Sequence, residues 1–162
     1  MEDVGLTPKD SHDKGAARMD LRDCIRFAND YPSCSLATVD GDRPRVRTFL
    51  LWFADETGFY FVTFSTKDVS RQLKANSMVE LCFFNNPANF QGMRQLRVAG
   101  RADLVDDEAL RSRALQERAY LEKAVGEPLG PTLEVYRVGS GEARFWTVRD
   151  FLKEPQIETV QF

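Results

Sequence analysis

A polar segment, Ser65-Thr66-Lys67-Asp68, joins two stretches of different character. The residues before it, FYFVTF, are aromatic and β-branched, which favours a strand, and those after it take the spacing of a short helix. The first turn of a helix has free backbone N–H groups and partial positive charge, so hydroxyls and an ammonium beside it can bind phosphate. The segment could also be only a helix cap, because Ser65-x-x-Asp68 approximates a capping box.

Lys67 is the residue that capping alone does not explain. A positive charge in the first turn opposes the helix dipole by about 0.3–1 kcal/mol, and a bound anion would reverse that cost. Lys67, Arg71 and Lys74 follow one another at i, i+4 and i+7. They therefore predict a basic helix face, which either borders a phosphate site or is simply solvated.

A second basic cluster lies in the segment RPRVRTFLL, where Arg43, Arg45 and Arg47 alternate. Alternating residues of a strand share one face, and this face continues into apolar Phe49 and Leu51. A flat, partly charged ligand would suit such a surface, although arginines on a solvated strand face are common.

Three more side chains extend these candidates. Arg94 and Arg97 are possible anion partners from another strand, and Trp146 supplies a ring that could cover a ligand or be an ordinary core residue. His12 is the single histidine, so Ser-His-Asp and Cys-His nucleophiles and histidine-rich metal sites are excluded elsewhere in the chain. A bound organic cofactor is the more plausible source of reactivity.

Composition limits the class of protein. The chain has 162 residues, 43% of them hydrophobic, and a net charge of −3, which does not favour a role in binding nucleic acid or membrane surfaces. The polar N-terminus lacks the apolar core of a signal peptide, and three cysteines without C-x-x-C spacing indicate a reducing compartment. We expect a cytoplasmic protein with an arm over residues 1–18, one domain over residues 19–150 and a tail over residues 151–162.

The first predicted element is a helix over residues 20–30. Leu21, Cys24, Ile25 and Ala28 form one apolar stripe, and Asp20 can cap the helix. Cys24 is then a small core residue and not a nucleophile.

Closely spaced hairpins follow this helix. Their turns are predicted at residues 40–42, 56–58 and 139–141, and further strands at residues 78–84 and 94–105. Helices are expected over residues 66–76 and from 106 to about 125, the second with a buried stripe formed by Leu110, Ala114, Leu121 and Val125. Six or seven mostly antiparallel strands with three helices favour a mainly β barrel. The segment after Trp146 could pack on this barrel or on a partner chain.

Five segments, in order, resemble the FMN-binding split barrel of the pyridoxamine 5′-phosphate oxidase family. They are SLATV, PRVRTFLL, FYFVTFSTKDVSRQLKANSMVELCFF, RQLRVAGRADLV and EARFW. The third is closest to the Thr-(x)₃-Lys segment of the smaller flavin-binding members. The resemblance implies a six-stranded antiparallel barrel and a homodimer with FMN at the subunit interface.

The resemblance also implies roles for individual residues. Arg47 would pair with the flavin or its phosphate, and Thr48 and Phe49 would present strand backbone to the polar edge of the ring. The residues that would surround the phosphate are Thr63, Ser65, Thr66 and Lys67, with support from Gln72. Gln95 and Arg97 would face the flavin from the next strand, and Trp146 would come from the second subunit.

Two departures from the family pattern bear on the substrate. The oxidases follow Phe-Trp with an Arg-x-His segment that grips pyridoxamine phosphate, whereas this chain has FWTVRDFLKEPQ. Trp52 stands where those enzymes carry a lysine. We therefore expect an FMN-dependent oxidoreductase for another small molecule, with a nicotinamide as a possible electron donor. The alternatives are a flavin-binding electron carrier or redox sensor without turnover, a barrel for another flat anionic cofactor, and a dimer that has lost its ligand.

Overall fold

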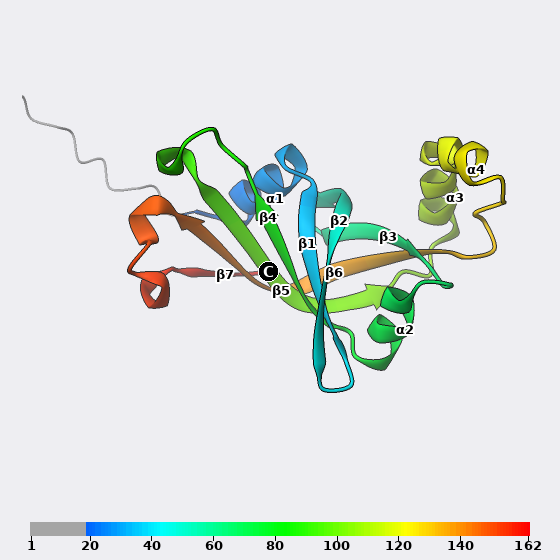
Figure 1. The fold of residues 1–162 in the computed structure, drawn as a ribbon, viewed down its shortest axis with the longest axis horizontal. Helices are drawn as coiled ribbons and strands as arrows, with labels where there is room; N and C mark the ends of the chain where they lie inside the picture. Colours follow the sequence, from blue (N-terminus) through cyan, green and yellow to red (C-terminus); the bar gives the residue numbers. More distant parts are fainter. Residues whose placement is uncertain (1–18) are drawn as a thin grey trace, which may run out of the picture.

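The computed structural model describes residues 19–162. The predicted N-terminal arm and His12 lie outside the described residues. Within them, the chain is mainly β, with helices around a barrel (Figure 1). No helix of this part of the chain is long and apolar enough to cross a membrane.

The predicted six-stranded antiparallel barrel is confirmed. Residues 19–162 contain seven strands: β1 (Ser33–Asp40), β2 (Arg43–Asp55), β3 (Gly58–Phe64), β4 (Met78–Phe84), β5 (Arg94–Leu104), β6 (Leu133–Thr147) and β7 (Thr159–Gln161). They pair in the order β3-β2-β1-β4-β5-β6-β7, and a further pairing of β3 with β6 closes the first six into a ring. The predicted turns at residues 40–42 and 56–58 join β1 to β2 and β2 to β3.

One of the predicted helices is divided into two. They are α1 (Leu21–Asp30), α2 (Asp68–Ala75), α3 (Glu108–Glu117) and α4 (Ala119–Val125), with short 3₁₀ helices η1 (Phe90–Gly92), η2 (Val148–Asp150) and η3 (Glu154–Gln156). The single helix expected up to residue 125 is wrong. Arg118 leaves helical geometry with φ −112° and ψ 12°, which separates α3 from α4. Of the predicted stripe only Ala114 is buried, and Val125 is exposed, because α4 turns away from the barrel.

Helix α1 agrees with its sequence signals. The Asp20 carboxylate accepts a hydrogen bond from the Asp23 N–H, and the Asp23 side chain accepts one from the Asp20 N–H, which makes a full capping box. Cys24, Phe27 and Ala28 are buried against the barrel. Burial raises the pKa of the Cys24 thiol to about 11, so the thiol stays neutral at physiological pH, as expected for a core residue.

The predicted hairpin turn at residues 139–141 is wrong. β6 runs through these residues without turning and shifts its register against β5 between Gly100 and Ala102. Gly141 has φ +154°, and a Cβ on it would lie 2.1 Å from the Ala99 carbonyl oxygen. The glycines therefore allow a close approach of two strands at a bulge, where a side chain would collide with backbone. Before this bulge β6 pairs with β3, and after it with β7.

The barrel interior is aromatic, and the C-terminal segment closes part of it. Phe61 and Tyr136 stack with ring centroids 5.7 Å apart, among a larger set of buried apolar side chains. Phe162 packs its ring against Phe59, and its backbone exchanges two hydrogen bonds with Gly141. The C-terminal segment was expected to pack either on this barrel or on a partner chain. In the structure, β7 and Phe162 pack on the barrel of their own chain.

Candidate functional site

The strand β2 has one open edge, and the candidate site lies along it. β2 pairs with β1 over residues 43–50, but its pairing with β3 begins only at Leu51. Among residues 19–162 no strand pairs with the second edge of residues 43–50. Backbone N–H and C=O groups on such an edge are available to a ligand.

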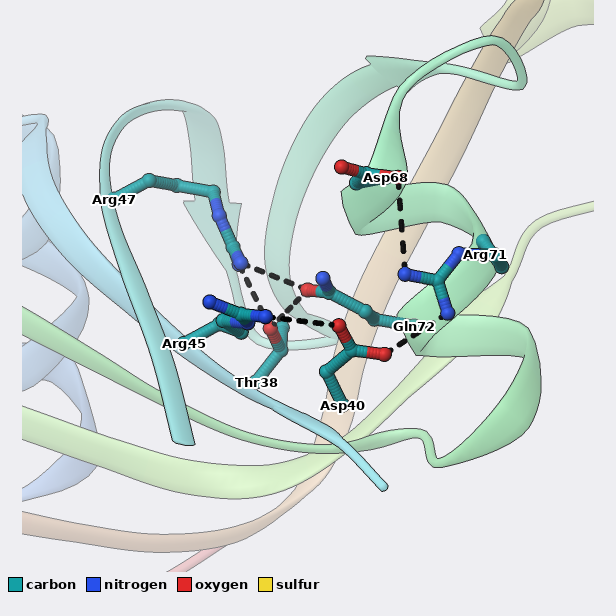
Figure 2. Close-up of polar contacts among 7 residues, drawn as sticks. All are labelled: Thr38, Asp40, Arg45, Arg47, Asp68, Arg71 and Gln72. Atoms are coloured by element: carbon teal, nitrogen blue, oxygen red, sulfur yellow. Dashed lines mark hydrogen bonds and ion pairs between the residues drawn. The ribbon is translucent and has the colours of Figure 1, made fainter. Parts of the chain in front are cut away.

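Arg47, Thr38 and Gln72 form a closed ring of hydrogen bonds beside this edge (Figure 2). Arg47 Nη1 donates to Thr38 Oγ1 (2.8 Å) and Nη2 donates to Gln72 Oε1 (2.7 Å), while Thr38 Oγ1 donates to the same Gln72 oxygen (2.6 Å). Partial burial lowers the pKa of Arg47, and neighbouring Arg45 adds to this, but a guanidinium stays charged at neutral pH. The structure thus brings together the predicted residues Arg47 and Gln72.

A chain of ion pairs fastens the β1–β2 hairpin to α2 next to this ring. Arg71 binds Asp40 (2.9 Å) and lies 3.7 Å from Asp68, and Arg45 approaches Asp40 from the other side (3.4 Å), as Figure 2 shows. The hydrogen bond from Arg71 is the main cause that lowers the pKa of Asp40. These groups are largely exposed, so the pairs contribute little to stability and weaken with salt.

The predicted helix cap at Ser65 or Thr66 is wrong. α2 begins at Asp68, so that Lys67 is the N-cap residue, and no side chain caps the helix. The reason is a turn: the Lys67 N–H donates to the Phe64 carbonyl oxygen, which delays the helix. Both hydroxyl side chains are exposed and form no capping bond.

Lys67 has no carboxylate partner among the described residues, and its ammonium lies 5.1 Å from the centre of the Phe64 ring. The other two cations of the predicted basic face are neutralised, because Arg71 binds Asp40 and Lys74 binds Glu134 (2.6 Å). All three cations are exposed, as the alternative of a solvated face requires, and Lys67 differs from the other two in having no carboxylate partner among the described residues.

Thr63 carries a further unsatisfied group four residues before Lys67. The side chain is 1% exposed, and its Oγ1 has no hydrogen-bond partner in the described part of the chain. A buried hydroxyl without a partner costs about 1–3 kcal/mol. Segment 63–67 thus combines a buried hydroxyl without a partner and an exposed ammonium without a carboxylate partner, and the exposed Ser65, Thr66 and Lys67 are the groups that an anion can reach.

The remaining predicted residues lie elsewhere on the barrel. Gln95 on β5 is paired across the sheet with Trp146 on β6, and Arg97 is held by Glu154 (2.7 Å) and Glu80 (3.6 Å). Trp146 contacts Phe151 edge to face.

These residues are separated from Arg47 within one chain. The strand order places β1 and β4 between β2 and β5, so Arg97 is three strand spacings from the Arg47 strand, about 14 Å along the sheet. Trp146 lies on β6, which neighbours β5 on one side and β3 on the other, near the end of the strand that pairs with Gln95 and lies beyond its pairing with β3. Thr48 is exposed on the outer face of β2, whereas Phe49 packs into the core against Phe61.

Sequence reasoning missed a second polar cluster, which anchors α2 to β6. Glu134 accepts hydrogen bonds from Ser70 (2.6 Å), Lys74 (2.6 Å) and Tyr136 (3.3 Å). Burial raises the pKa of Glu134, but the hydrogen bonds from Lys74 and Ser70 outweigh burial, so the net pKa is lowered. Trp52, the departure from the family pattern, is bound to α3 instead: its indole donates to Glu117 (2.5 Å).

Replacing Glu134 by glutamine is expected to lower the free energy of unfolding at pH 7 by about 1–3 kcal/mol, because charge-assisted hydrogen bonds are lost. The pKa of Glu134 is lower in the folded protein than in the unfolded chain. Its contribution to stability is therefore complete above the ordinary carboxyl pKa and is lost as the pH falls through the folded-state pKa.

Urea unfolding measures this effect: the free energies of unfolding of wild type and Glu134→Gln should differ at pH 7 and converge in acid. Glu127→Gln, in the exposed loop after α4, is the control. A difference independent of pH would contradict this assignment.

Comparison with known proteins gives the family of this chain. A family model described as pyridoxamine 5′-phosphate oxidase matches residues 22–147. A pyridoxine/pyridoxamine 5′-phosphate oxidase of Brucella canis is 30% identical, with 76% of this chain and 73% of that protein covered. The resemblance inferred from the sequence motifs is therefore confirmed.

Two solved structures show the same fold. A NimC/NimA family protein of Clostridium acetobutylicum has a TM-score of 0.68 at 24% identity, with 87% of this chain and 91% of that chain covered. An FAD-binding protein of Mesorhizobium loti has a TM-score of 0.63 at 14% identity, with 78% and 94% covered. The family model and the curated relative show that the chain belongs to the pyridoxamine 5′-phosphate oxidase family.

Proposed function

We propose that this protein binds FMN and acts as an FMN-dependent oxidoreductase on a small molecule. The observation that carries the proposal is the start of α2, where the exposed Lys67 ammonium has no carboxylate partner among the described residues and the exposed hydroxyls of Ser65 and Thr66 form no capping bond. Membership of the family and the FAD-binding protein among the structural neighbours support a flavin. The proposal accounts for a free cation at a helix start, where it would otherwise be unfavourable.

In this proposal each group has a task that its place in the fold supports. The residues that hold the phosphate are Thr63, Ser65, Thr66 and Lys67. Arg47, oriented by Gln72, binds the flavin at the open edge of β2, where the backbone of Thr48 and Phe49 is available. FMN supplies hydride transfer when bound, and the chain supplies binding, orientation and positive charge.

We further propose that the protein is a homodimer with one site at each end of the interface. Gln95 and Arg97 lie on β5, on the opposite side of the six-strand ring from β2, and Trp146 is paired with Gln95, so in this proposal all three come from the second subunit. The outer face of the barrel carries exposed Val46 (68%), Leu50 (62%) and Met78 (51%), which a second copy would cover. Light scattering should then give twice the chain mass of 18.5 kDa.

A mixing experiment tests the shared site. Arg47→Ala and Trp146→Ala homodimers should each bind FMN weakly. If the two residues come from different subunits, exchange between the variants creates a heterodimer with one intact site of two, so an equal mixture after random exchange recovers roughly a quarter of the wild-type binding capacity. A mixture no better than its separate components would contradict a shared site.

The substrate is proposed to differ from pyridoxamine 5′-phosphate. The segment after Trp146 lacks the Arg-x-His pattern of the oxidases, and residues 19–162 contain no histidine. The test is the visible spectrum of the isolated protein, followed by anaerobic addition of reduced nicotinamides and of pyridoxamine 5′-phosphate. Bound flavin bleached by a nicotinamide but not by pyridoxamine 5′-phosphate supports the oxidoreductase. Bound flavin that no donor reduces supports an electron carrier or sensor, and a protein that binds no flavin overturns the proposal.

A further inference from the structure

We propose that Thr38 is a positioning residue of the cofactor site, which acts by holding the guanidinium of Arg47 at the open edge of β2. The inference rests on the proposed flavin function and deepens it. Thr38 belongs to β1, Arg47 to β2 and Gln72 to α2, so three separate elements meet at one hydroxyl (Figure 2). None of the motifs noted in the sequence includes Thr38 as a binding residue.

The hydroxyl of Thr38 uses both of its hydrogen-bonding capacities. It accepts from Arg47 Nη1 (2.8 Å) and donates to Gln72 Oε1 (2.6 Å), and the same Gln72 oxygen accepts from Arg47 Nη2 (2.7 Å). The side chains of Thr38 and Gln72 are 2% and 3% exposed, so water does not compete readily for these bonds. A flexible arginine is thereby fixed by two acceptors at once, Thr38 Oγ1 and Gln72 Oε1.

This arrangement also decides which donors remain for a ligand. Two of the guanidinium N–H groups of Arg47 are used within the ring, and the others stay available. Gln72 uses its amide oxygen for both bonds of the ring, so the ring does not occupy its amide N–H groups. A site oriented before the ligand arrives loses less conformational freedom on binding, which strengthens the complex.

The neighbouring ion pairs do not provide this orientation. Asp40 binds Arg45 and Arg71 on the exposed side of the hairpin, and it makes no contact with Arg47. Salt weakens such exposed pairs, whereas the buried ring is little affected. Arg47 therefore depends on Thr38 and Gln72, and Thr38 can be altered without removing a charge.

The test is a double-mutant cycle on FMN affinity, measured by flavin fluorescence quenching. Thr38→Val, which keeps the shape and removes the hydroxyl, should weaken binding about tenfold, and Thr38→Ser should stay within about threefold of wild type. In an Arg47→Ala background, Thr38→Val should have no further effect, because its influence passes through Arg47. Thr57→Val, which removes a hydrogen-bonded hydroxyl in the β2–β3 turn, is the matched control.

A readout without flavin keeps the proposal testable if a variant is less stable. In folded Thr38→Val protein, the guanidinium NMR signals of Arg47 should show faster rotation than in wild type. The role of Thr38 is overturned if Thr38→Val leaves the FMN affinity of the wild-type protein unchanged. It is also overturned if Thr38→Val lowers the FMN affinity equally with Arg47 present and with Arg47 replaced by alanine. In both cases the proposed function itself still stands. Wild-type protein that does not bind FMN overturns the proposed function, and the positioning role falls with it.

Discussion

Arg47→Ala is expected to lower the affinity for FMN about 10- to 100-fold, which corresponds to the loss of charge-assisted hydrogen bonds worth about 1.5–3 kcal/mol. Arg47 lies at the open edge of β2 with its guanidinium already fixed by Thr38 and Gln72. Its removal leaves Thr38 bonded to Gln72, so the barrel should remain folded. Flavin fluorescence titration and a thermal melt measure the two properties separately.

Two further variants make this result specific. Arg43→Ala removes an exposed arginine from the same strand, and it should leave the affinity within about twofold of wild type. Arg47→Lys keeps the positive charge but loses the paired N–H donors of the guanidinium. Its affinity for FMN should therefore lie between those of Arg47→Ala and the wild-type protein. Equal losses for Arg43→Ala and Arg47→Ala would show that only overall charge matters and would contradict a defined role for Arg47.

Gly141→Ala is expected to destabilise the protein by about 3–5 kcal/mol, the sum of backbone strain and forced movement of packed strands. The new Cβ would meet the Ala99 carbonyl oxygen at 2.1 Å and the Gly100 Cα at 2.9 Å. Both contacts are backbone atoms of β5, so no side chain can move aside. The measurement is the free energy of unfolding from urea titration.

Gly41→Ala is the matched control for this variant. Gly41 also has a positive φ, +66°, but a Cβ there would have no atom within 4 Å. Backbone strain should therefore lower the free energy of unfolding of Gly41→Ala by only about 1 kcal/mol. If the two variants were equally destabilised, the close approach of β5 and β6 at the bulge would be refuted.

Local signals predicted those parts of the fold that depend on neighbouring residues. The Asp20 cap of α1 and the turn at Gly41 are short-range features, and both were predicted correctly. The glycines at residues 139–141 gave a false turn, because a bulge and a hairpin turn favour the same residue types. A hairpin turn is excluded by the pairing of β6 with β3, whose residues are far away in the chain: Val138 pairs with Phe59, 79 residues earlier.

The candidate site likewise combines residues that local patterns identify with residues whose role depends on distant segments of the chain. Arg47 and Lys67 were identified from charge patterns and a family motif; in the structure Arg47 is hydrogen-bonded to Thr38 and Gln72, and Lys67 lies over the Phe64 ring without a carboxylate partner among the described residues. Thr38 was missed, because in SLATV it has the character of an ordinary inward-facing strand residue. Its role depends on Gln72, 34 residues further along the chain. Glu134 was missed for the same reason, since its partner Lys74 is 60 residues away.

The central claim is that Arg47 binds a flavin whose phosphate is held by segment 63–67. Parallel titrations of the purified protein with FMN and with riboflavin, which lacks the phosphate, test it most directly. The account predicts saturation at one FMN per chain and an affinity for FMN at least tenfold higher than for riboflavin, with the difference reduced in Lys67→Ala. Equal affinity for the two flavins, or no binding of either, would contradict it.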